Sequence, residues 1–273
     1  MIRRQRHDQF VLMGQHDHAL LSGHLARYWG NSHFATPVPW EAVCDACGWH
    51  DCGWTEHDAA PTLNARGLPL DVFEPPVLLA LQAWSASVDR VQAKFGPYAA
   101  LLVSLHGLGL SAFSAGNEHT RPEMFQINKF QHQQAERQES LRRQLGLRTD
   151  LPLRLGLARD GADVQEDALA YNYQVLQVVD RLTLSLLCQE VVFPQIQGVR
   201  SSPGGPARCL SVSRPAEWEL TVEPWPFEPL QLRLSINCRV LPATTFASDD
   251  EFRAAFAAAQ PREQTLTLRP PSS

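Results

Sequence analysis

The spacing of the apolar residues changes near residue 200, and this change limits what the chain can fold into. Up to about residue 190, apolar residues recur three and four positions apart, which is the pattern of amphipathic helices. Beyond residue 200, short runs such as CLSVS, WELTV and LQLRLSINCRVL stand between prolines and are typical of β-strands. The sequence therefore predicts a mainly α fold, a helical bundle that carries a small C-terminal β-rich or α+β appendage.

The same change predicts two structural units. Residues 1–200 would form a helical domain, with room for one short strand at Gln9–Met13 that could complete the later sheet. Residues 201–273 would form a small β-rich subdomain packed on it. The run PYAALLVSLHGLGLSAF (97–113) is apolar nearly all round, which predicts a helix buried in the middle of the bundle. The segment 161–190 has strong helical periodicity and predicts another long helix.

Composition and charge exclude several classes of partner. The chain has 24 Lys and Arg against 29 Asp and Glu, a net charge of -5, so we expect no broad cationic surface for nucleic acid or an anionic membrane. No run of about 18 apolar residues could span a bilayer, and the start of the chain has no secretory apolar core. We expect a cytoplasmic protein with a small-molecule substrate, whose six cysteines stay as thiols and which could form a homo-oligomer.

The hexapeptide WHDCGW (49–54) sets two metal-binding side chains, His50 and Asp51, next to each other near the end of an expected helix. All ten histidines lie between His7 and His132, so any imidazole chemistry belongs to the first half of the chain. Consecutive side chains diverge by about 100° on a helix, so one of the pair can bind a metal while the other bridges or meets a second ion.

Three further polar residues fall on apolar faces of expected helices. His18 and Asp180 each lie on the apolar stripe of their helix, and His106 lies in the most apolar helix of the chain. An unpaired buried carboxylate costs several kcal/mol, so Asp180 has to meet a cation, hydrogen-bond donors or a metal ion. His18, His50, Asp51 and Asp180 therefore predict a metal site whose ligand atoms lie within about 5 Å of a common point, and His106 should line the same cavity.

This order of residues, a His, a His-Asp pair, a further His and a late Asp, resembles the HD superfamily of α-helical metal-dependent phosphohydrolases and their di-iron oxygenase relatives. The resemblance implies an HD-like helical bundle that binds a divalent metal, which could be Fe, Mn, Zn or Mg. The ligand set that it implies consists of His18, His50, Asp51 and Asp180, with His106 available for a second metal.

Longer motifs cover nearly the whole chain. They are QHDHALLSGHLARYWG near the N-terminus, HDCGW followed by Asp58 and Pro61, LLVSLHG, VVDRLTLSLLC and the late VEPWPF. Together they resemble a bacterial family catalogued as domain of unknown function 3891. The family name conveys no activity, so this resemblance supports the fold and the site rather than a reaction.

These features predict a metal-dependent, phosphohydrolase-like enzyme that acts on a small anionic compound. The metal would lower the pKa of a bound water and polarise the scissile group. Asp51 would be the catalytic residue, because it could hold the metal and the water together. Few cations stand near the motifs to receive a phosphate, and the candidates are Arg27, Arg90, Arg121 and Arg181.

Three more residues could support the site or contact the substrate. His16 precedes a helix and could be a ligand, a substrate contact or a hydrogen-bond partner. Trp54 could line a pocket above the metal, and Asp58 could orient a ligand histidine as a hydrogen-bond acceptor. Cys44 and Cys47 form a single C-x-x-C, which is a weak zinc signal without a second such pair.

Two other functions stay open. A di-iron oxygenase would use the same ligands but needs a full six-ligand set, with His16 or His57 at the second metal position. A non-catalytic binding protein would contain only a buried polar cluster, in which Asp180 pairs directly with His18 or His50.

Overall fold

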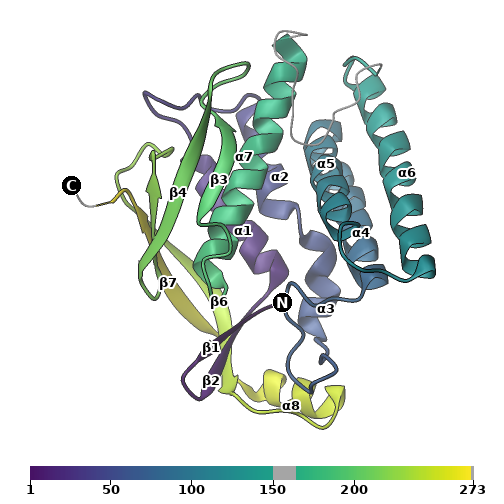
Figure 1. Ribbon diagram of the computed structural model, residues 1–273, viewed down its shortest axis with the longest axis vertical. Helices are drawn as coiled ribbons and strands as arrows, with labels where there is room; N and C mark the ends of the chain where they lie inside the picture. The colour runs from purple at the N-terminus through teal and green to yellow at the C-terminus, as the bar shows by residue number, and fades with distance from the viewer. Residues whose placement is uncertain (150–163, 272–273) are drawn as a thin grey trace.

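The computed structural model describes residues 1–149 and 164–271. The chain is 49% helical and 21% strand, and seven strands form one curled mixed sheet. The fold is therefore α/β. The expected mainly α fold, an all-α HD-like bundle with a small appendage, is wrong. Figure 1 shows the sheet on one side of the molecule and the helices layered beside it.

The helices of the described residues include the two that apolar periodicity predicts over 97–113 and 161–190. The helices are α1 (Gln15–Arg27), α2 (Trp40–Trp49), the 3-10 helix η1 (Cys52–Trp54), α3 (Thr55–Ala59), α4 (Val77–Phe95), α5 (Pro97–Ser114), α6 (Arg121–Gln144), α7 (Val164–Leu187) and α8 (Asp249–Ala258). The helix expected over 161–190 corresponds to α7, and residues 161–163 lie outside the described residues. At α6, a capping box between Thr120 and Glu123 fixes the first turn.

The strands come from both ends of the chain. They are β1 (Ile2–Arg6), β2 (Gln9–Met13), β3 (Gln195–Arg200), β4 (Ala207–Ala216), β5 (Glu219–Glu223), β6 (Leu232–Pro242) and β7 (Arg262–Arg269). Their order in the sheet is β1-β2-β6-β7-β5-β4-β3. Neighbouring strands are antiparallel except for the parallel pair β5 and β7. The division of the chain at residue 200 stays a prediction.

The sheet is larger than expected because segments on both sides of the helical region add strands to it. A strand was predicted at β2, but β1 pairs with it as a hairpin, and β3 begins before residue 200. Along β6, buried and exposed residues alternate, so one face of the strand is covered. This alternation identifies the covered face of a strand but not its neighbours, so the extent of the sheet could not be predicted from it.

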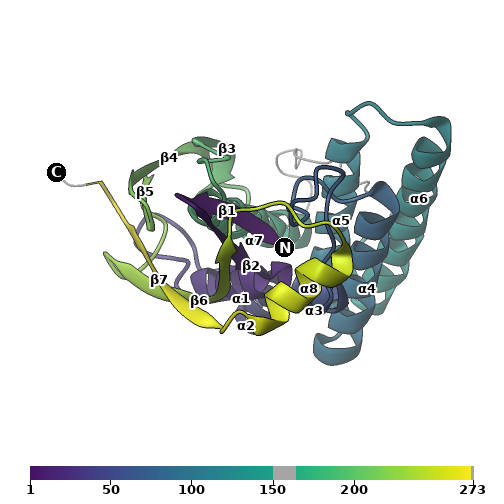
Figure 2. The same cartoon turned by 90° about the horizontal axis from the view of Figure 1, so that it is seen from below.

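The helices form layers that extend away from the sheet. Helices α1 and α7 contact the sheet, α2 and α5 lie next to them, and α4 and α6 pack on α5 (Figures 1 and 2). By length and composition α5 could cross a membrane, but 56% of its 18-residue span is buried inside the protein. This is consistent with the core helix of a soluble protein.

Two close helix contacts position the interior polar residues. The indole N–H of Trp29 donates to the hydroxyl of Tyr171 at 3.0 Å and ties the residues that follow α1 to α7. Helices α1 and α2 approach through Gly23 and Gly48, where a Cβ on Gly23 would lie only 2.6 Å from the Cα of Gly48. The first half of α1, the end of α2 and the second half of α7 also meet in the interior, where His18, His50 and Asp180 lie close together.

Candidate metal centre

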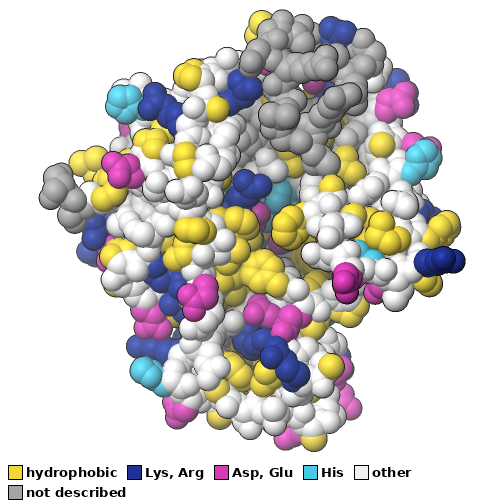
Figure 3. Space-filling view, viewed as in Figure 1, with side chains coloured by type: hydrophobic (Ala, Val, Ile, Leu, Met, Phe, Trp, Pro, Cys, Tyr) yellow, Lys and Arg dark blue, Asp and Glu magenta, His cyan; other side chains and the backbone are white. Residues whose placement is uncertain are grey.

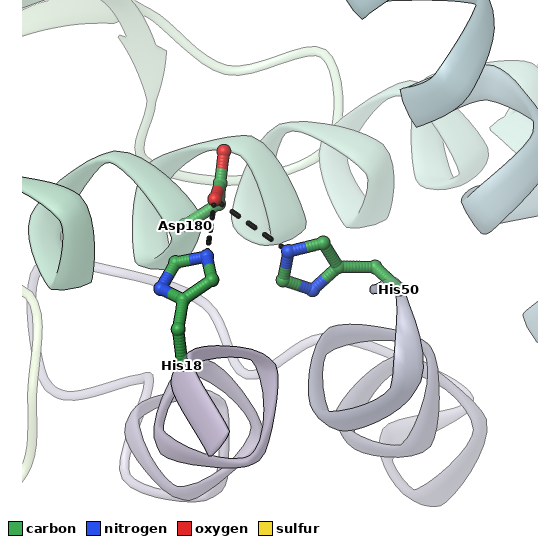
Figure 4. A group of neighbouring side chains, drawn as sticks. All are labelled: His18, His50 and Asp180. Atoms are coloured by element: carbon green, nitrogen blue, oxygen red, sulfur yellow. Dashed lines mark hydrogen bonds and ion pairs between the residues drawn. The ribbon is translucent and has the colours of Figure 1, made fainter. Parts of the chain in front are cut away.

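Three potential metal ligands meet where these helices converge. His18 lies near the start of α1, Asp180 lies in the second half of α7, and His50 directly follows α2. The three residues are 1%, 7% and 2% exposed, respectively. One imidazole nitrogen from each histidine and one carboxylate oxygen all lie within 4.8 Å of one another (Figure 4). We call these three residues the His-His-Asp group.

The separations within the His-His-Asp group suit a shared cation. The Nε2 atom of His18 is 3.0 Å from Asp180 Oδ1, and the Nε2 atom of His50 is 3.5 Å from the same oxygen. Two ligand atoms at about 2.1 Å from one metal are roughly 3.0 Å apart at a right angle and roughly 3.4 Å apart at a tetrahedral angle. The group could therefore hold a metal ion, provided that its ligand atoms, which all lie within 4.8 Å of one another, approach to about 4.2 Å or less.

The other nitrogen of each imidazole is anchored by an oxygen. His50 Nδ1 is 2.8 Å from the carbonyl of Cys47, which can only accept, so this nitrogen donates. His18 Nδ1 is 3.0 Å from the hydroxyl of Thr183, and that hydroxyl can itself donate to backbone carbonyls of α7. Both rings thus turn Nε2 toward Asp180. Metal-binding histidines usually have such a partner on the second nitrogen, because it fixes the tautomer and the ring orientation.

Asp51 and His106 lie at the edge of the group. Asp51 Oδ2 is 3.5 Å from His50 Nε2, and its other oxygen is buried without a hydrogen-bond partner. His106 Nε2 is 3.8 Å from Asp180 Oδ2, and its ring packs edge-on against that of His50 with centroids 5.0 Å apart. Both residues are buried, at 7% and 5% exposure. The structure therefore brings all five predicted ligands into one interior region, three of them tightly.

Burial and mutual charge set the ionisation of these residues. Burial opposes a charge on His50, but the carboxylates of Asp51 and Asp180 outweigh it and raise the pKa of His50 to about 9. Burial also disfavours the anion of Asp180, yet the imidazoles of the group hold its pKa well below the usual value. By contrast, burial lowers the pKa of His106 to about 3. Near neutral pH and without metal, His50 is therefore a cation, Asp180 an anion and His106 neutral.

The residues predicted to support the site lie nearby but outside the His-His-Asp group. The backbone N–H of His16 donates to Asp58 Oδ2 at 3.0 Å, and the His16 ring packs edge-on against Trp49. Asp58 therefore accepts a hydrogen bond from a backbone amide. The sequence had suggested that it could accept one from the imidazole of a metal-binding histidine. Trp54 is buried, and its ring packs edge-on against His57.

Among the arginines considered for an anionic substrate, Arg90 donates to the carbonyl of Cys52 at 2.6 Å and pairs with Glu56. Arg181 is the other arginine that acts on the site. It follows Asp180 on α7, is half-buried, and its positive charge contributes to the lowered pKa of His106. Its guanidinium lies 5.6 Å from the ring centre of Phe193. Figure 3 shows a hollow between α7 and the α4–α6 side of the molecule, in which a histidine adjoins basic and acidic side chains. The other three, Arg27, Arg90 and Arg121, belong to α1, α4 and the start of α6.

Sequence reasoning missed the groups that anchor the histidines. Ser22 Oγ is 2.8 Å from Thr183 Oγ1, and this pair joins α1 to α7 directly behind His18. Thr183 is three residues after Asp180, and Ser22 is four residues after His18, so helical spacing could have found both. The carbonyl of Cys47 leaves no such signal, because a backbone oxygen is present at every residue.

A buried His-His-Asp group beside a curled sheet defines an α/β protein with a candidate metal site. The chain belongs to the family described as "Protein of unknown function (DUF3891)", which matches residues 1–243. This confirms the family resemblance that the motifs indicated, and the matched range contains every residue of the group. No curated protein and no solved structure matches the chain.

Proposed function

We propose that the protein is a metal-dependent hydrolase with a small-molecule substrate. The observation that carries the proposal is the His-His-Asp group, in which two anchored imidazoles turn Nε2 toward one buried carboxylate. The order of His18, the His50-Asp51 pair and Asp180 also resembles the HD motif. A ligand set of two nitrogens and one oxygen suits Zn, Mn or Fe better than Mg, which prefers oxygen ligands.

The neighbouring residues supply what hydrolysis requires. A divalent cation in the group would act as a Lewis acid that polarises the scissile group and lowers the pKa of water. Asp51 is well placed to accept the proton of the attacking water, because its Oδ2 lies 3.5 Å from His50 Nε2 of the group. Burial raises the pKa of Asp51, which makes it a stronger base than an exposed carboxylate.

The substrate that we propose carries an anionic group. Arg181 supports this choice, because it adjoins Asp180 on α7 and its charge is felt at His106. Phosphate esters fit best, since a guanidinium binds two phosphate oxygens at once while the cation binds another.

Elemental analysis followed by turnover assays tests this function. The full chain is purified without chelator, its metal content is measured, and it is then assayed with Zn²⁺, Mn²⁺ or Fe²⁺ against a panel of phosphate esters. We expect about one metal per chain and metal-dependent release of phosphate. Bound metal without turnover of any ester would reject the hydrolase while leaving the metal site intact.

A non-catalytic protein is the second candidate, and one contact favours it. His18 Nε2 and Asp180 Oδ1, 3.0 Å apart, already form a hydrogen bond without a metal. Such a buried pair could be purely structural. In that case neither a chelator nor an added divalent cation would shift the melting temperature, whereas a metal site predicts stabilisation by the bound cation.

The di-iron oxygenase that the sequence left open would need more ligands than the group provides. Neither His16 nor His57 contributes an atom to it. Oxygen consumption and a visible charge-transfer band in iron-loaded protein would restore this alternative.

A further inference from the structure

Buried polar atoms without a hydrogen-bond partner concentrate around the candidate metal centre. Within residues 1–149 and 164–271, nine buried side-chain nitrogen or oxygen atoms have no such partner, and seven of them belong to segments 15–16 and 50–58. One of the seven is Nε2 of His50, which belongs to the His-His-Asp group. The other six belong to Gln15, His16, Asp51, Trp54, His57 and Asp58, and we call these six residues the unpaired cluster. Gln15, Asp51 and Trp54 are more than nine-tenths buried, at 4%, 7% and 3% exposure.

The two segments meet next to the His-His-Asp group. The hydrogen bond from the His16 backbone to Asp58 joins the start of α1 to α3. Gln15 precedes His18 by three residues, so both lie on one face of α1. Asp51 is 3.5 Å from an imidazole of the group, and its charge and that of Asp58 are close enough to affect each other. The unpaired cluster therefore adjoins the proposed reaction site.

The energetics require a partner for these atoms. A buried polar group that loses its hydrogen bond costs about 1–3 kcal/mol. Six such groups would together offset much of the roughly 5–15 kcal/mol by which a domain is stable. Buried polar groups in folded proteins are almost always satisfied by protein, water or a ligand. The unpaired cluster is thus suited to bind something polar from outside the chain.

We infer that the unpaired cluster binds the hydroxyl groups of the substrate, so that the substrate is a phosphorylated polyol; this inference rests on the proposed function. The free atoms of Gln15 and Asp51 are acceptors, and Trp54 offers the one N–H that must donate. Asp58 Oδ1 is not free in the same sense, because it forms an ion pair with the N-terminal ammonium of Met1 at 3.7 Å. Imidazole nitrogens can do either. An excess of acceptors, each needing a donor, matches a row of hydroxyl groups.

Charge sets the orientation of such a substrate. The carboxylate of Asp58 is paired with the N-terminal ammonium of Met1, but that of Asp51 would repel a second anionic group, which disfavours a phosphate in the unpaired cluster. Arg181 belongs to α7, whereas Gln15 and Asp58 belong to α1 and α3. We therefore assign the phosphate to the α7 side of the His-His-Asp group and the hydroxyl groups to the side of α1 and α3.

Two phosphonates of equal charge and chain length test this inference, because their carbon–phosphorus bond resists hydrolysis. The metal-loaded full chain is titrated with 2,3,4-trihydroxybutylphosphonate and with butylphosphonate in a calorimeter. We expect the hydroxylated ligand to bind about tenfold more tightly or better, given about 0.5–1.5 kcal/mol per hydrogen bond. Gln15→Met and Trp54→Phe should each reduce this preference about threefold or more, and His24→Gln, on the exposed side of α1, should not.

The possible outcomes separate the two proposals. Protein that holds no metal would reject the proposed function. Bound metal with equal affinities for the two phosphonates would reject this inference alone, and would mean that water satisfies the unpaired cluster. The comparison in the wild-type chain does not depend on the variants, so a variant that fails to fold leaves the test decisive. A preference that survives both substitutions would also overturn the assignment.

Discussion

The His-His-Asp group and the unpaired cluster are adjacent, but their hydrogen bonding differs. In the group, His18 is bonded on both nitrogens, and His50 is anchored through Nδ1. In the unpaired cluster, every residue retains a buried atom without a hydrogen bond, although that of Asp58 forms an ion pair with the N-terminus of the chain. The first region is preorganised, since its rings are fixed before any ligand arrives. The hydrogen-bonding groups of the second region are satisfied only when a ligand or water binds, as expected where a substrate enters and leaves.

The largest loss of metal affinity should follow substitution of Asp180, which both histidines of the group face. Asp180→Asn keeps the shape of the side chain but removes the anionic ligand, so we expect metal affinity to fall by about 100-fold or more, beyond the range for loss of a supporting hydrogen bond. Metal titration by calorimetry measures it. As a control, Asp167→Asn, near the start of the same helix, should retain the wild-type affinity. Equal affinities of the two variants would show that the group does not bind metal.

A smaller loss of metal affinity is expected when the Thr183 hydroxyl, which anchors the ring of His18, is removed. Thr183→Val is nearly isosteric but leaves His18 Nδ1 without its partner, so metal affinity should fall about 10- to 100-fold. Thr183→Ser retains the hydroxyl and should stay close to wild type. If Val and Ser behave alike in the same titration, the hydroxyl does not orient the ring.

The apparent affinity for metal should change about tenfold per pH unit. The pKa of His50 is raised to about 9, so below that pH a metal has to displace its proton. Apparent affinity should therefore fall as the pH is lowered, by about tenfold between pH 8 and pH 7, with one proton released per metal. Calorimetric titrations in buffers of different ionisation enthalpy measure the number of protons released, because the observed heat changes in proportion to it. An affinity that is flat over this range would mean that His50 binds no metal.

The smallest effect is expected in the unpaired cluster. Gln15→Met removes an amide oxygen that bonds to nothing, so the metal-free chain should change in stability by less than about 1 kcal/mol. Its metal affinity should stay within about twofold of wild type. Chemical denaturation and metal titration measure these quantities. A large loss of stability would reveal an internal partner for Gln15 and remove the contrast between the two regions.

The site was more predictable than the fold. A polar residue on an apolar helical stripe must point inward, and helical periodicity alone selects His18, Asp180 and His106 on this ground. The His50-Asp51 pair stands out as two adjacent metal-binding residue types. The unpaired atom of Gln15 was not foreseen, because a glutamine near the start of a helix is ordinarily exposed to solvent.

The fold prediction failed at the sheet for a specific reason. One N-terminal strand was expected at β2, but its hairpin partner β1 has the sequence IRRQR, whose charged residues indicate no strand. Arg4 is nevertheless buried, because its guanidinium donates to the carbonyls of Leu186 and Glu217. Contacts this far apart in the sequence cannot be inferred from local composition.

By itself, the sequence determined the long helices, the inward position of His18, His106 and Asp180, and the family to which the chain belongs. These properties follow from short-range periodicity and from motifs, both of which a linear chain displays. Only the tertiary structure decided that β1 and β2 join β6 in a seven-stranded sheet, and that residues 162 positions apart place His18 and Asp180 within 3.0 Å. Strand partners and helix packing depend on contacts between distant segments, and these are selected by the whole interior rather than by any one stretch of sequence.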